Sequence, residues 1–257
     1  MAGDALRRPR LRPDHALGDP GRHPRSPGLP DRALGLLREH SRNGSALNPV
    51  ERLHEAYGSS RRARVLARQL AEQLPPRGRL LDVGCGDGEI DRLIGETHPD
   101  LQMEGIDVLV RPDASIPVTA FDGRKIPHPD DSFDGVLFVD VLHHSDDATE
   151  LLREARRVAR DFVLIKDHRL NGLLAGPTLR FMDDVGNARH GVALPYNYWS
   201  HERWHEAFES LTLEVTGWKQ ELGIYPWPAS WVFGRGLHFI ARLGVAAGGG
   251  SGAAGGP

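Results

Sequence analysis

The chain has 257 residues, of which 39% are hydrophobic and 26% charged, so it can bury a core. Its formal net charge of −3 and pI near 6.5 give no general attraction to nucleic acid or anionic membranes, so no nucleic-acid partner is expected. The single cysteine, Cys85, excludes a disulfide framework or a CxxC metal site within the chain. A cytoplasmic location and no metal site are expected. No apolar run is long enough to span a bilayer, and the N-terminus lacks the apolar core of a secretory signal.

The two ends differ in composition from the rest of the chain. Residues 1–30 are rich in Arg, Pro and Gly, and proline at this density blocks helices and strand ladders, so a disordered tail is expected. An Arg-rich transit peptide is the alternative, although the prolines and acids argue against an amphipathic helix. Residues 244–257 are mostly Gly and Ala and predict a second flexible tail. One domain is therefore predicted over residues 31–243.

Helical and strand-like segments alternate along this domain. Apolar residues at helical spacing predict helices, and short apolar runs bounded by glycine or acid predict buried strands. The predicted helices cover 61–74, 89–97, 149–160 and 200–208, and the predicted strands cover 79–83, 102–108, 118–121, 133–139, 162–165, 211–218 and 236–243. Such alternation predicts an α/β fold, namely a doubly wound, seven-stranded, mostly parallel sheet with an antiparallel C-terminal strand.

Two longer segments, 166–199 and 219–235, interrupt the alternation. They are expected to be insertions on the side of the domain where the molecule acted upon, called the acceptor, binds. Residues 173–185 are apolar enough to predict a lid helix there. The insertions hold aromatic residues among prolines, which predict the walls of a pocket for an apolar or aromatic acceptor, with plain core packing as the alternative. These aromatic residues are Tyr196, Tyr198, Trp199, Trp227 and Trp231.

The strongest signal is an apolar strand that runs into a glycine loop, LLDVGCGDG over residues 80–88. Glycine lets the backbone turn sharply and lets a ligand approach closely, and the helix that follows offers free N–H groups. The next strand ends in Asp107, roughly twenty residues after Gly88, where an acid accepts hydrogen bonds from both ribose hydroxyls. On its own this pattern predicts a site for an adenosine-containing ligand.

Three details favour S-adenosylmethionine over a dinucleotide. The loop follows the pattern G-x-G-x-G, and Glu89 stands where the dehydrogenase pattern has its last glycine. Asp82 precedes the loop, where a carboxylate repels a pyrophosphate but attracts a cationic amino acid. Further acids follow at Asp122 and Asp140, although acids are also common in turns. An acidic site suits the ammonium and the sulfonium of S-adenosylmethionine.

Several segments resemble, in order, the motifs of class I S-adenosylmethionine-dependent methyltransferases, and together they cover residues 57–166. LDVGCGDG at 81–88 resembles the first motif and GID at 105–107 the second. DG at 122–123, followed by IP at 126–127 and DDSFD at 130–134, resembles the third and fourth. LHH at 142–144 is similar to the small-molecule branch that includes quinone methyltransferases. The resemblance implies a Rossmann-like methyltransferase fold and S-adenosylmethionine as the cofactor.

The resemblance also implies a role for each matching position. Asp107 is expected to hold the ribose, Asp122 the adenine amino group and the Gly123 backbone the adenine ring, while Tyr57 closes over the cofactor. The methionine end is expected to meet Asp82, Gly84, Asp140 and Leu142. Gly86 is expected to pack against the adenosine, and the remaining cofactor-binding positions are Cys85, Gly88 and Val108.

Methyl transfer from a sulfonium is an in-line displacement, so holding the nucleophile, the methyl carbon and the sulfur in line is most of the work. A hydroxyl acceptor also needs a base, and histidine is the usual one at neutral pH. His168 is our first candidate and His143 the second, because both follow predicted strands and ligands bind at the carboxyl ends of parallel strands. These residues favour O-methylation of a small, apolar or aromatic acceptor.

The sequence also bears on several other activities. Cys85 lies inside the glycine loop, so we expect it to pack rather than to attack a cytosine base. The fourth strand lacks the (Asp/Asn)-Pro-Pro-(Tyr/Phe) motif of enzymes that methylate amino groups of nucleic-acid bases and glutamine. Three alternatives stay open: an NAD-dependent oxidoreductase with a variant loop, a non-catalytic S-adenosylmethionine-binding protein and an RNA methyltransferase.

Overall fold

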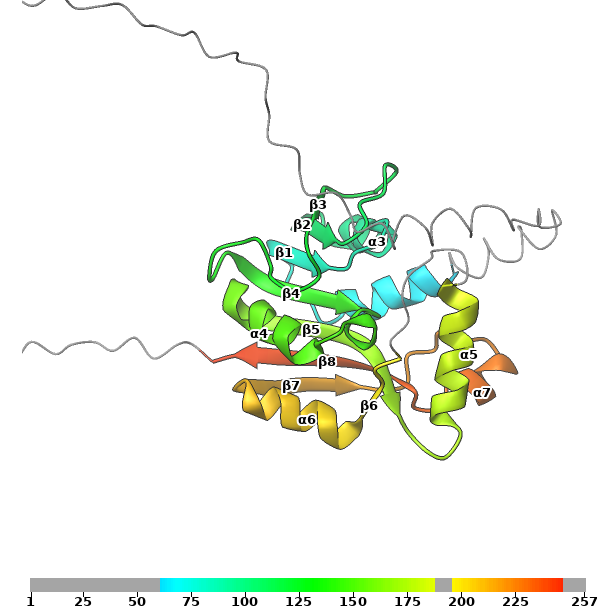
Figure 1. Cartoon of the computed structure of the whole chain (residues 1–257). Coiled ribbons are helices and arrows are strands. Elements are labelled where there is room, and N and C mark those ends of the chain that lie inside the picture. Colours follow the sequence, from blue (N-terminus) through cyan, green and yellow to red (C-terminus); the bar gives the residue numbers. More distant parts are fainter. Residues whose placement is uncertain (1–60, 188–195, 247–257) are drawn as a thin grey trace, which may run out of the picture. The chain divides into compact units, whose positions relative to one another are not determined.

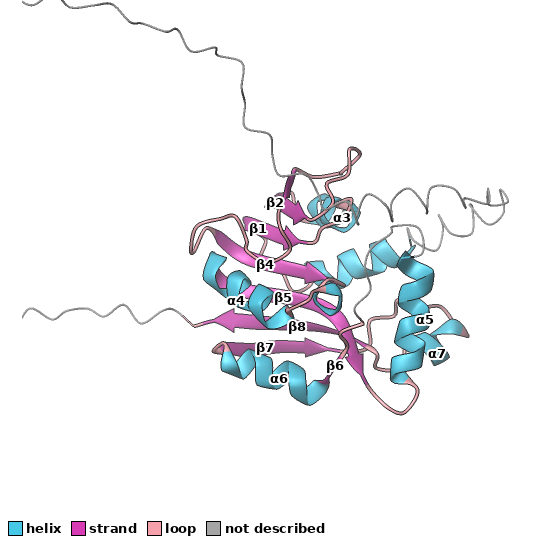
Figure 2. Ribbon diagram, viewed as in Figure 1, coloured by secondary structure: helices cyan, strands magenta, loops and turns pink. Residues whose placement is uncertain are grey.

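The computed structural model describes residues 61–187 and 196–246, and all of them lie in the second of the chain's two units, Ala46–Pro257. A sheet with the strand order β3-β2-β1-β4-β5-β8-β7 forms the centre, and the two-residue β6 pairs with β5 outside this path (Figures 1 and 2). The strands are β1 Arg77–Val83, β2 Asp100–Asp107, β3 Val118–Ala120, β4 Phe133–Val139, β5 Ala159–Leu170, β6 Trp199–Ser200, β7 Leu213–Lys219 and β8 His238–Val245.

The direction of the strands matches the predicted fold class. β1, β2, β3, β4 and β5 pair in parallel, and β8 runs antiparallel to both β5 and β7. The seven predicted strands are therefore confirmed, with one antiparallel strand near the end of the chain. The predicted fifth strand, 162–165, was too short because β5 extends to Leu170. Its pairing with β8 continues as far as His168 opposite His238, through polar residues that do not read as a strand.

Helices cover both faces of the sheet and its carboxyl edge. α4 and α6 pack on one face, residues 61–71 and α3 pack on the other, and α5 and α7 lie beyond the edge at which β4 and β5 end (Figure 2). The helix predicted at 173–185 is present as α5, and its role as a lid stays a prediction, whereas α7 was not predicted. The helix bounds are α3 Glu89–Thr97, α4 Ala148–Val158, α5 Ala175–Asn187, α6 His201–Ser210 and α7 Ala229–Phe233, with a short 3-10 helix, η1, at Leu142–His144.

Two apolar layers hold these helices to the sheet. On one face, Leu151 of α4 is buried in one cluster with Trp204 and Phe208, which lie four residues apart on the same side of α6. On the other face, Leu66 and Ile94 pack against the sheet in a second cluster. Burial on both faces explains why the strands read as continuous apolar runs.

Some sequence-based predictions fall outside these residues. The predicted tail at 1–30 and Tyr57 lie outside the described residues, as do residues 247–257 of the tail predicted at 244–257, so the domain boundaries stay predictions. Gly244 and Val245, at the start of that predicted tail, are the last residues of β8. Among the helices in the described part, none is both long and apolar enough to cross a membrane.

Candidate active site

The glycine loop connects β1 to α3 and holds a backbone that other residues rarely adopt. Gly84, Gly86 and Gly88 all have positive φ, at 79°, 62° and 68°. A Cβ at Gly84 would approach Val141 to 2.6 Å. The loop therefore packs directly against the segment after β4, which joins the predicted cofactor loop to the predicted acceptor side.

Asp107, at the end of β2, is bonded to this loop. Its Oδ2 accepts the backbone N–H of Gly86 and its Oδ1 accepts that of Leu109, both at 2.8 Å. Each carboxylate oxygen has a further lone pair, so Asp107 keeps the capacity to accept hydrogen bonds from a ribose. The structure thus brings together the loop and the acid that the sequence assigned to one ligand.

The residues predicted to surround adenine also lie close to one another. Val108 is 64% exposed, and a Cβ at Gly123 would lie 3.2 Å from its Cγ1. Asp122 Oδ1 accepts the backbone N–H groups of Arg124 and Lys125, both at 2.9 Å, and these bonds lower its pKa. Asp122 therefore shapes a turn, and its contact with an adenine amino group stays a prediction.

The surroundings of Cys85 do not suit a nucleophile. A Cβ added at Gly105 would meet its Sγ at 2.3 Å, so the thiol fills the space above that glycine. Burial, together with the acids Asp82 and Asp91, raises its pKa above the ordinary value. A thiol held in its protonated form is a poor nucleophile, which agrees with the packing role expected from the sequence.

Asp82 and Asp91 form a pair of buried carboxylates beneath the glycine loop. Each is 2% exposed, and neither side-chain oxygen of Asp91 has a hydrogen-bond partner among the described residues. Burial raises the pKa of Asp82 well above its ordinary value and that of Asp91 to about 7. The sequence predicted Asp82 as a cofactor residue but gave no role to Asp91.

Asp140, at the carboxyl end of β4, lies in the middle of a buried charge cluster. Its backbone has φ 58°, a left-handed conformation that is strained for a residue other than glycine. Its carboxylate accepts the ammonium of the fully buried Lys166 and the guanidinium of Arg62, the latter at 2.6 Å. Burial raises the pKa of Asp140, but Lys166 and Arg62 outweigh it and hold the pKa well below the ordinary value.

His143, in η1, is held between two acids. Its Nδ1 lies 2.5 Å from Asp167 Oδ1 and its Nε2 lies 3.3 Å from Asp183 Oδ2 on α5. The Asp167 carboxylate also accepts the backbone N–H of Leu142 at 3.0 Å. Burial lowers the pKa of His143, but the two carboxylates raise it to about 10. An imidazole with this pKa is protonated at neutral pH and cannot accept a proton.

His168, on β5, has the opposite protonation. Its Nδ1 lies 3.6 Å from carboxylate oxygens of both Asp140 and Asp167 and 3.5 Å from His143 Nδ1. Burial and the neighbouring Lys166 ammonium lower the pKa of His168 below its ordinary value. His168 is therefore a neutral imidazole at neutral pH, and it is able to accept a proton.

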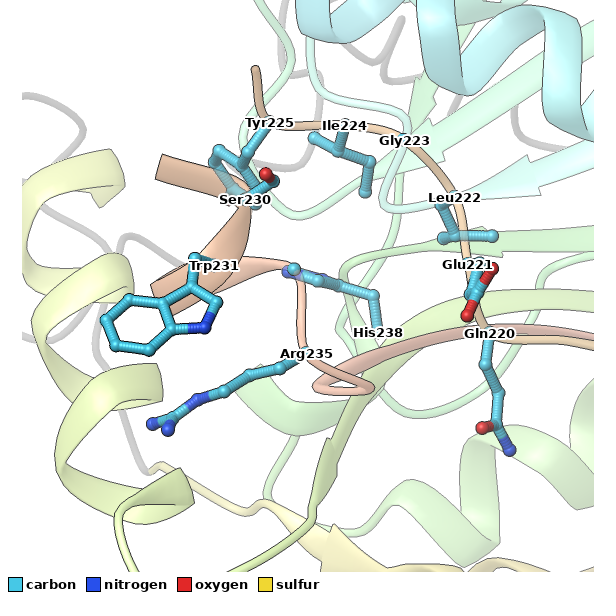
Figure 3. Close-up of a pocket in the computed structure, with 11 residues that line it drawn as sticks. Gln220, Glu221, Leu222, Gly223, Ile224, Tyr225, Ser230, Trp231, Arg235 and His238 are labelled. Atoms are coloured by element: carbon cyan, nitrogen blue, oxygen red, sulfur yellow. The ribbon is translucent and has the colours of Figure 1, made fainter. Parts of the chain in front are cut away.

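A cavity of about 250 Å³ opens beside this cluster, at the edge where β7 ends and β8 begins. Tyr225, Trp231 and the buried His238 are among its lining residues, and the His238 ring points toward the side formed by Ser230 and Trp231 (Figure 3). His238 Nδ1 lies 3.4 Å from the ammonium of Lys166. One imidazole thus separates the cavity from the charge cluster.

The five aromatic residues predicted to wall a pocket lie in different surroundings. Trp231 lines the cavity together with Tyr225, which was not predicted, whereas Trp227 is 85% exposed and is not among the lining residues. Tyr196 does not line the cavity, and its hydroxyl bonds Asp184. Trp199 is buried in the core beside α6. Tyr198 donates its hydroxyl to Asp183, so it joins α5 to the histidine cluster. For Trp199, the alternative of plain core packing is therefore confirmed.

Among the described residues, two sets of side chains have the composition of a metal site, and in each set the ligand atoms lie within 4.8 Å of one another. The sets are His143, Asp167 and His168, and His143, His144 and Asp183. Two ligands of one tetrahedral ion, each about 2.0–2.1 Å away, lie roughly 3.3 Å apart. The 2.5 Å between His143 Nδ1 and Asp167 Oδ1 is instead a hydrogen-bond distance. We therefore expect a hydrogen-bonded cluster at the first set, and the predicted absence of a metal stays a prediction.

Sequence reasoning missed several members of this site, namely Arg62, Asp91, Lys166, Asp167, Asp183 and His238. Lys166, Asp167 and His168 are consecutive polar residues that directly follow the apolar run 162–165. Three polar residues in a row at the end of a buried strand are a usable signal, because each must find a partner when it is buried. The other residues come from distant elements and carry no comparable local pattern.

Comparison with known proteins decides the family. A family described as a methyltransferase domain matches residues 54–216, which is more than half of the chain. The chain belongs to this family. The predicted class I S-adenosylmethionine-dependent methyltransferase is therefore confirmed, and the family implies S-adenosylmethionine as the cofactor. The family does not favour the NAD-dependent alternative.

Curated relatives match part of this methyltransferase chain. It is 31% identical over 144 residues to 27-O-demethylrifamycin SV methyltransferase of Amycolatopsis mediterranei, covering 45% of this chain and 53% of that protein. It is 28% identical over 168 residues to 2-methyl-6-phytyl-1,4-hydroquinone methyltransferase of Synechocystis, covering 57% and 48%. A tRNA (carboxymethyluridine(34)-5-O)-methyltransferase of Schizosaccharomyces pombe is 31% identical over 87 residues, covering 32% and 36%. The chain spans about half the length of the first and second of these relatives.

Solved structures agree on the fold of this methyltransferase chain. The complex of the Haloferax volcanii Trm112 methyltransferase activator with a methyltransferase matches with a TM-score of 0.56 at 17% identity, covering 76% of this chain and 96% of that one. An S-adenosylmethionine-dependent methyltransferase of Thermotoga maritima matches with a TM-score of 0.55 at 19% identity, covering 76% and 95%. At these identities the likeness supports the Rossmann-like fold alone.

Proposed function

We propose that this protein transfers the methyl group of S-adenosylmethionine to a hydroxyl of a small apolar or aromatic acceptor, with His168 as the general base. The observation that carries the proposal is the pair of histidines beside Asp140. His143 is protonated between Asp167 and Asp183, whereas His168, 3.5 Å away, is neutral. Only a neutral imidazole can take the proton of a hydroxyl acceptor.

The cofactor is proposed to lie along the carboxyl edge of the sheet. Asp107 holds the ribose, Val108 and Gly123 flank the adenine, and the methionine end lies between the glycine loop and Asp140. This position follows from the contact of Gly84 with Val141, because it places the loop next to the end of β4. The methyl group then faces β5, where His168 lies.

The acceptor is proposed to bind on the β8 side of that edge. The cavity of about 250 Å³ is walled by Tyr225 and Trp231, whose rings suit an apolar or aromatic molecule. His238 closes its inner end, and its ring centre lies 4.7 Å from that of His168. Because His168 is only 3% exposed, α5 and Tyr198 must shift for an acceptor to reach it. This supports the lid role predicted for 173–185.

The names of the relatives support hydroxyl chemistry, and the net charge supports a small acceptor. The names of two relatives specify an O-methyl position, on a rifamycin and on a tRNA uridine. The net charge of −3 argues for a small acceptor rather than RNA. Any screen for the acceptor should therefore include tRNA.

The test is turnover with purified full-length protein. S-adenosylhomocysteine release is measured with S-adenosylmethionine and a panel of hydroquinones, phenols and bulk tRNA, in wild type, His168→Ala and Trp227→Ala. We expect turnover on a phenolic acceptor, a loss of about 10²-fold or more in kcat for His168→Ala, and little change for the exposed Trp227→Ala control. Unchanged kcat in His168→Ala would remove the base assignment, and turnover on tRNA alone would remove the small-acceptor assignment.

The remaining alternative is a protein that binds S-adenosylmethionine without transferring its methyl group. A structure named as the [4+2]-cyclase SpnF has the same fold, with a TM-score of 0.50 at 18% identity and coverage of 71% of this chain and 80% of that one. The fold therefore accommodates a protein whose name specifies another reaction. Cofactor binding with no S-adenosylhomocysteine release on any acceptor would favour this alternative.

A further inference from the structure

We propose that Asp183 is the latch of α5: its carboxylate is held by His143 and by the Tyr198 hydroxyl, and acceptor entry requires these contacts to break. The proposal rests on the proposed function and deepens it, because it names the contacts that control access to His168. It gives α5 two positions, closed as in this structure and open when an acceptor enters or leaves.

α5 has a small apolar contact with the rest of the domain. Among the described residues, this contact is a cluster of four buried side chains, namely Ala175, Leu179, Tyr198 and Leu237. The cluster is much smaller than the two that hold α3, α4 and α6 to the sheet. On the outer side of α5, Phe181 is 58% exposed. Elements with few buried apolar contacts open at low cost in free energy, so the polar contacts of α5 decide how firmly it is held.

Asp183 joins α5 to the carboxyl edge of the sheet. Its side chain is buried, and its Oδ2 lies 3.3 Å from His143 Nε2 and accepts the Tyr198 hydroxyl. One carboxylate thus connects α5 to η1 and to the segment that precedes β6. A buried carboxylate that loses such partners is unfavourable until water reaches it, so these contacts stabilise the closed position.

The contacts of His143 indicate a cation. A carboxylate only accepts hydrogen bonds, so the 2.5 Å between His143 Nδ1 and Asp167 Oδ1 requires a proton on Nδ1. Nε2 faces Asp183 at 3.3 Å, where the lone pair of a bare nitrogen would repel the carboxylate and an N–H group attracts it. His143 and Asp183 therefore carry opposite charges, and their attraction holds α5 against η1.

These two partners of Asp183 are fixed to each other and to the sheet. The backbone N–H of Asn197, the neighbour of Tyr198, donates to the His143 carbonyl at 3.1 Å. β6 follows directly and pairs with the end of β5. Since η1 and this segment are bonded to each other, α5 is the element that moves when the contacts of Asp183 break.

The closed position of α5 hides the proposed base. The Tyr198 ring centre lies 6.2 Å from that of His168 and 5.6 Å from that of His143, and His168 is 3% exposed. When α5 moves away, the Tyr198 hydroxyl loses its acceptor on Asp183 and its ring is free to turn. Opening therefore gives an acceptor a way to His168, and closing excludes water while the methyl group is transferred.

The experiment uses the free full-length protein. Amide hydrogen exchange measures the opening of α5, and diethyl pyrocarbonate labelling measures the exposure of His168, both read by mass spectrometry. The variants are Asp183→Asn, which removes the charge, and Tyr198→Phe, which removes one hydroxyl and keeps the ring. The matched control is Asp184→Asn, because the next carboxylate along α5 is exposed and accepts the Tyr196 hydroxyl in the same way.

We expect the amides of α5 to exchange about tenfold faster or more in Asp183→Asn, since a hydrogen bond to a charged group is lost. Exchange should be several-fold faster in Tyr198→Phe and unchanged in Asp184→Asn. Labelling of His168 should rise in the same order, while the amides of β4 and α6 keep their wild-type protection.

The proposal is overturned if Asp183→Asn behaves like Asp184→Asn. If Asp183→Asn does not fold, Tyr198→Phe decides: unchanged exchange in α5, or faster exchange over the whole sheet, would also overturn it. Both measurements are made without an acceptor, so their result does not depend on whether His168→Ala lowers turnover. Failure of the latch and failure of the base assignment are therefore distinguishable.

Discussion

Asp107 accepts the backbone N–H of Gly86 at 2.8 Å, so the side chain proposed to bind ribose also closes the glycine loop. Because the two oxygens of Asp107 already bond Gly86 and Leu109, the loop is held in place before any ligand arrives. Preorganised loops lose less freedom on binding, which raises affinity. This one carboxylate therefore affects both the stability of the free protein and its affinity for the cofactor.

The first prediction concerns Asp107→Ala. We expect the Kd for S-adenosylhomocysteine to rise by about 10²-fold, because two hydrogen bonds to a charged acceptor are lost at about 1.5–3 kcal/mol each and part of that is recovered from water. Calorimetric titration measures the change. Asp122→Ala serves as the comparison, since that carboxylate is exposed and mainly shapes a turn. Equal effects of the two substitutions would contradict the ribose assignment.

A second prediction separates the two histidines by pH. Since the pKa of His168 is lowered below its ordinary value of 6.5, kcat/KM should rise with pH on the acid side and level off before neutrality. His143, with a pKa of about 10, stays protonated over the same range and contributes no step there. The profile is measured by S-adenosylhomocysteine release from pH 5 to pH 9. A wild-type profile that keeps rising through pH 8 would point away from His168.

A third prediction concerns stability at His143. His143→Ala leaves Asp167 buried without its charged partner, which costs about 3–5 kcal/mol in the free energy of unfolding. The double variant His143→Ala with Asp167→Ala should recover a large part of that loss, because the buried Asp167 charge is then absent and Asp183 keeps the hydrogen bond from the Tyr198 hydroxyl. Urea unfolding of the single and double variants gives the coupling energy. Additive losses would show that the pair does not act as a unit.

A fourth prediction concerns the pH dependence of folding. The folded-state pKa of Asp91 is raised from 3.8 to about 7, so the folded state binds more protons than the unfolded state between these values. The contribution of this pair to stability is therefore full below about pH 4 and is lost as pH rises toward about 7. Asp91→Asn should gain stability relative to wild type over that interval. Thermal unfolding of both proteins from pH 4.5 to pH 8 measures the difference, and parallel curves would contradict the prediction.

A fifth prediction concerns metal ions. Asp140 already bonds Lys166 and Arg62, and Asp167 already bonds His143, so the acids at the site have their counter-charges from the protein. Methyl transfer should therefore continue in excess EDTA, as measured by S-adenosylhomocysteine release. Activity that is lost with EDTA and restored by one divalent ion would assign that ion to the histidine cluster instead.

The sequence by itself determined the fold class and the cofactor, and it predicted the residues of the cofactor site. These features are local: the glycine loop, Asp107 and the apolar runs each lie within one short segment, where backbone geometry and burial leave few residue choices. Even the bounds of α3 and β4 follow from the residues within them.

Only the tertiary structure decided the protonation of the acceptor side. His143 and His168 look equivalent in sequence, because each follows a strand of the same sheet. Their pKa values move in opposite directions because Asp183 on α5 and Asp167 on β5 flank one ring, while Lys166 lies beside the other. The raised pKa of Asp91 likewise follows from its burial in the folded protein. Charges interact through space at a few ångströms, so no spacing along the chain reveals which groups will meet.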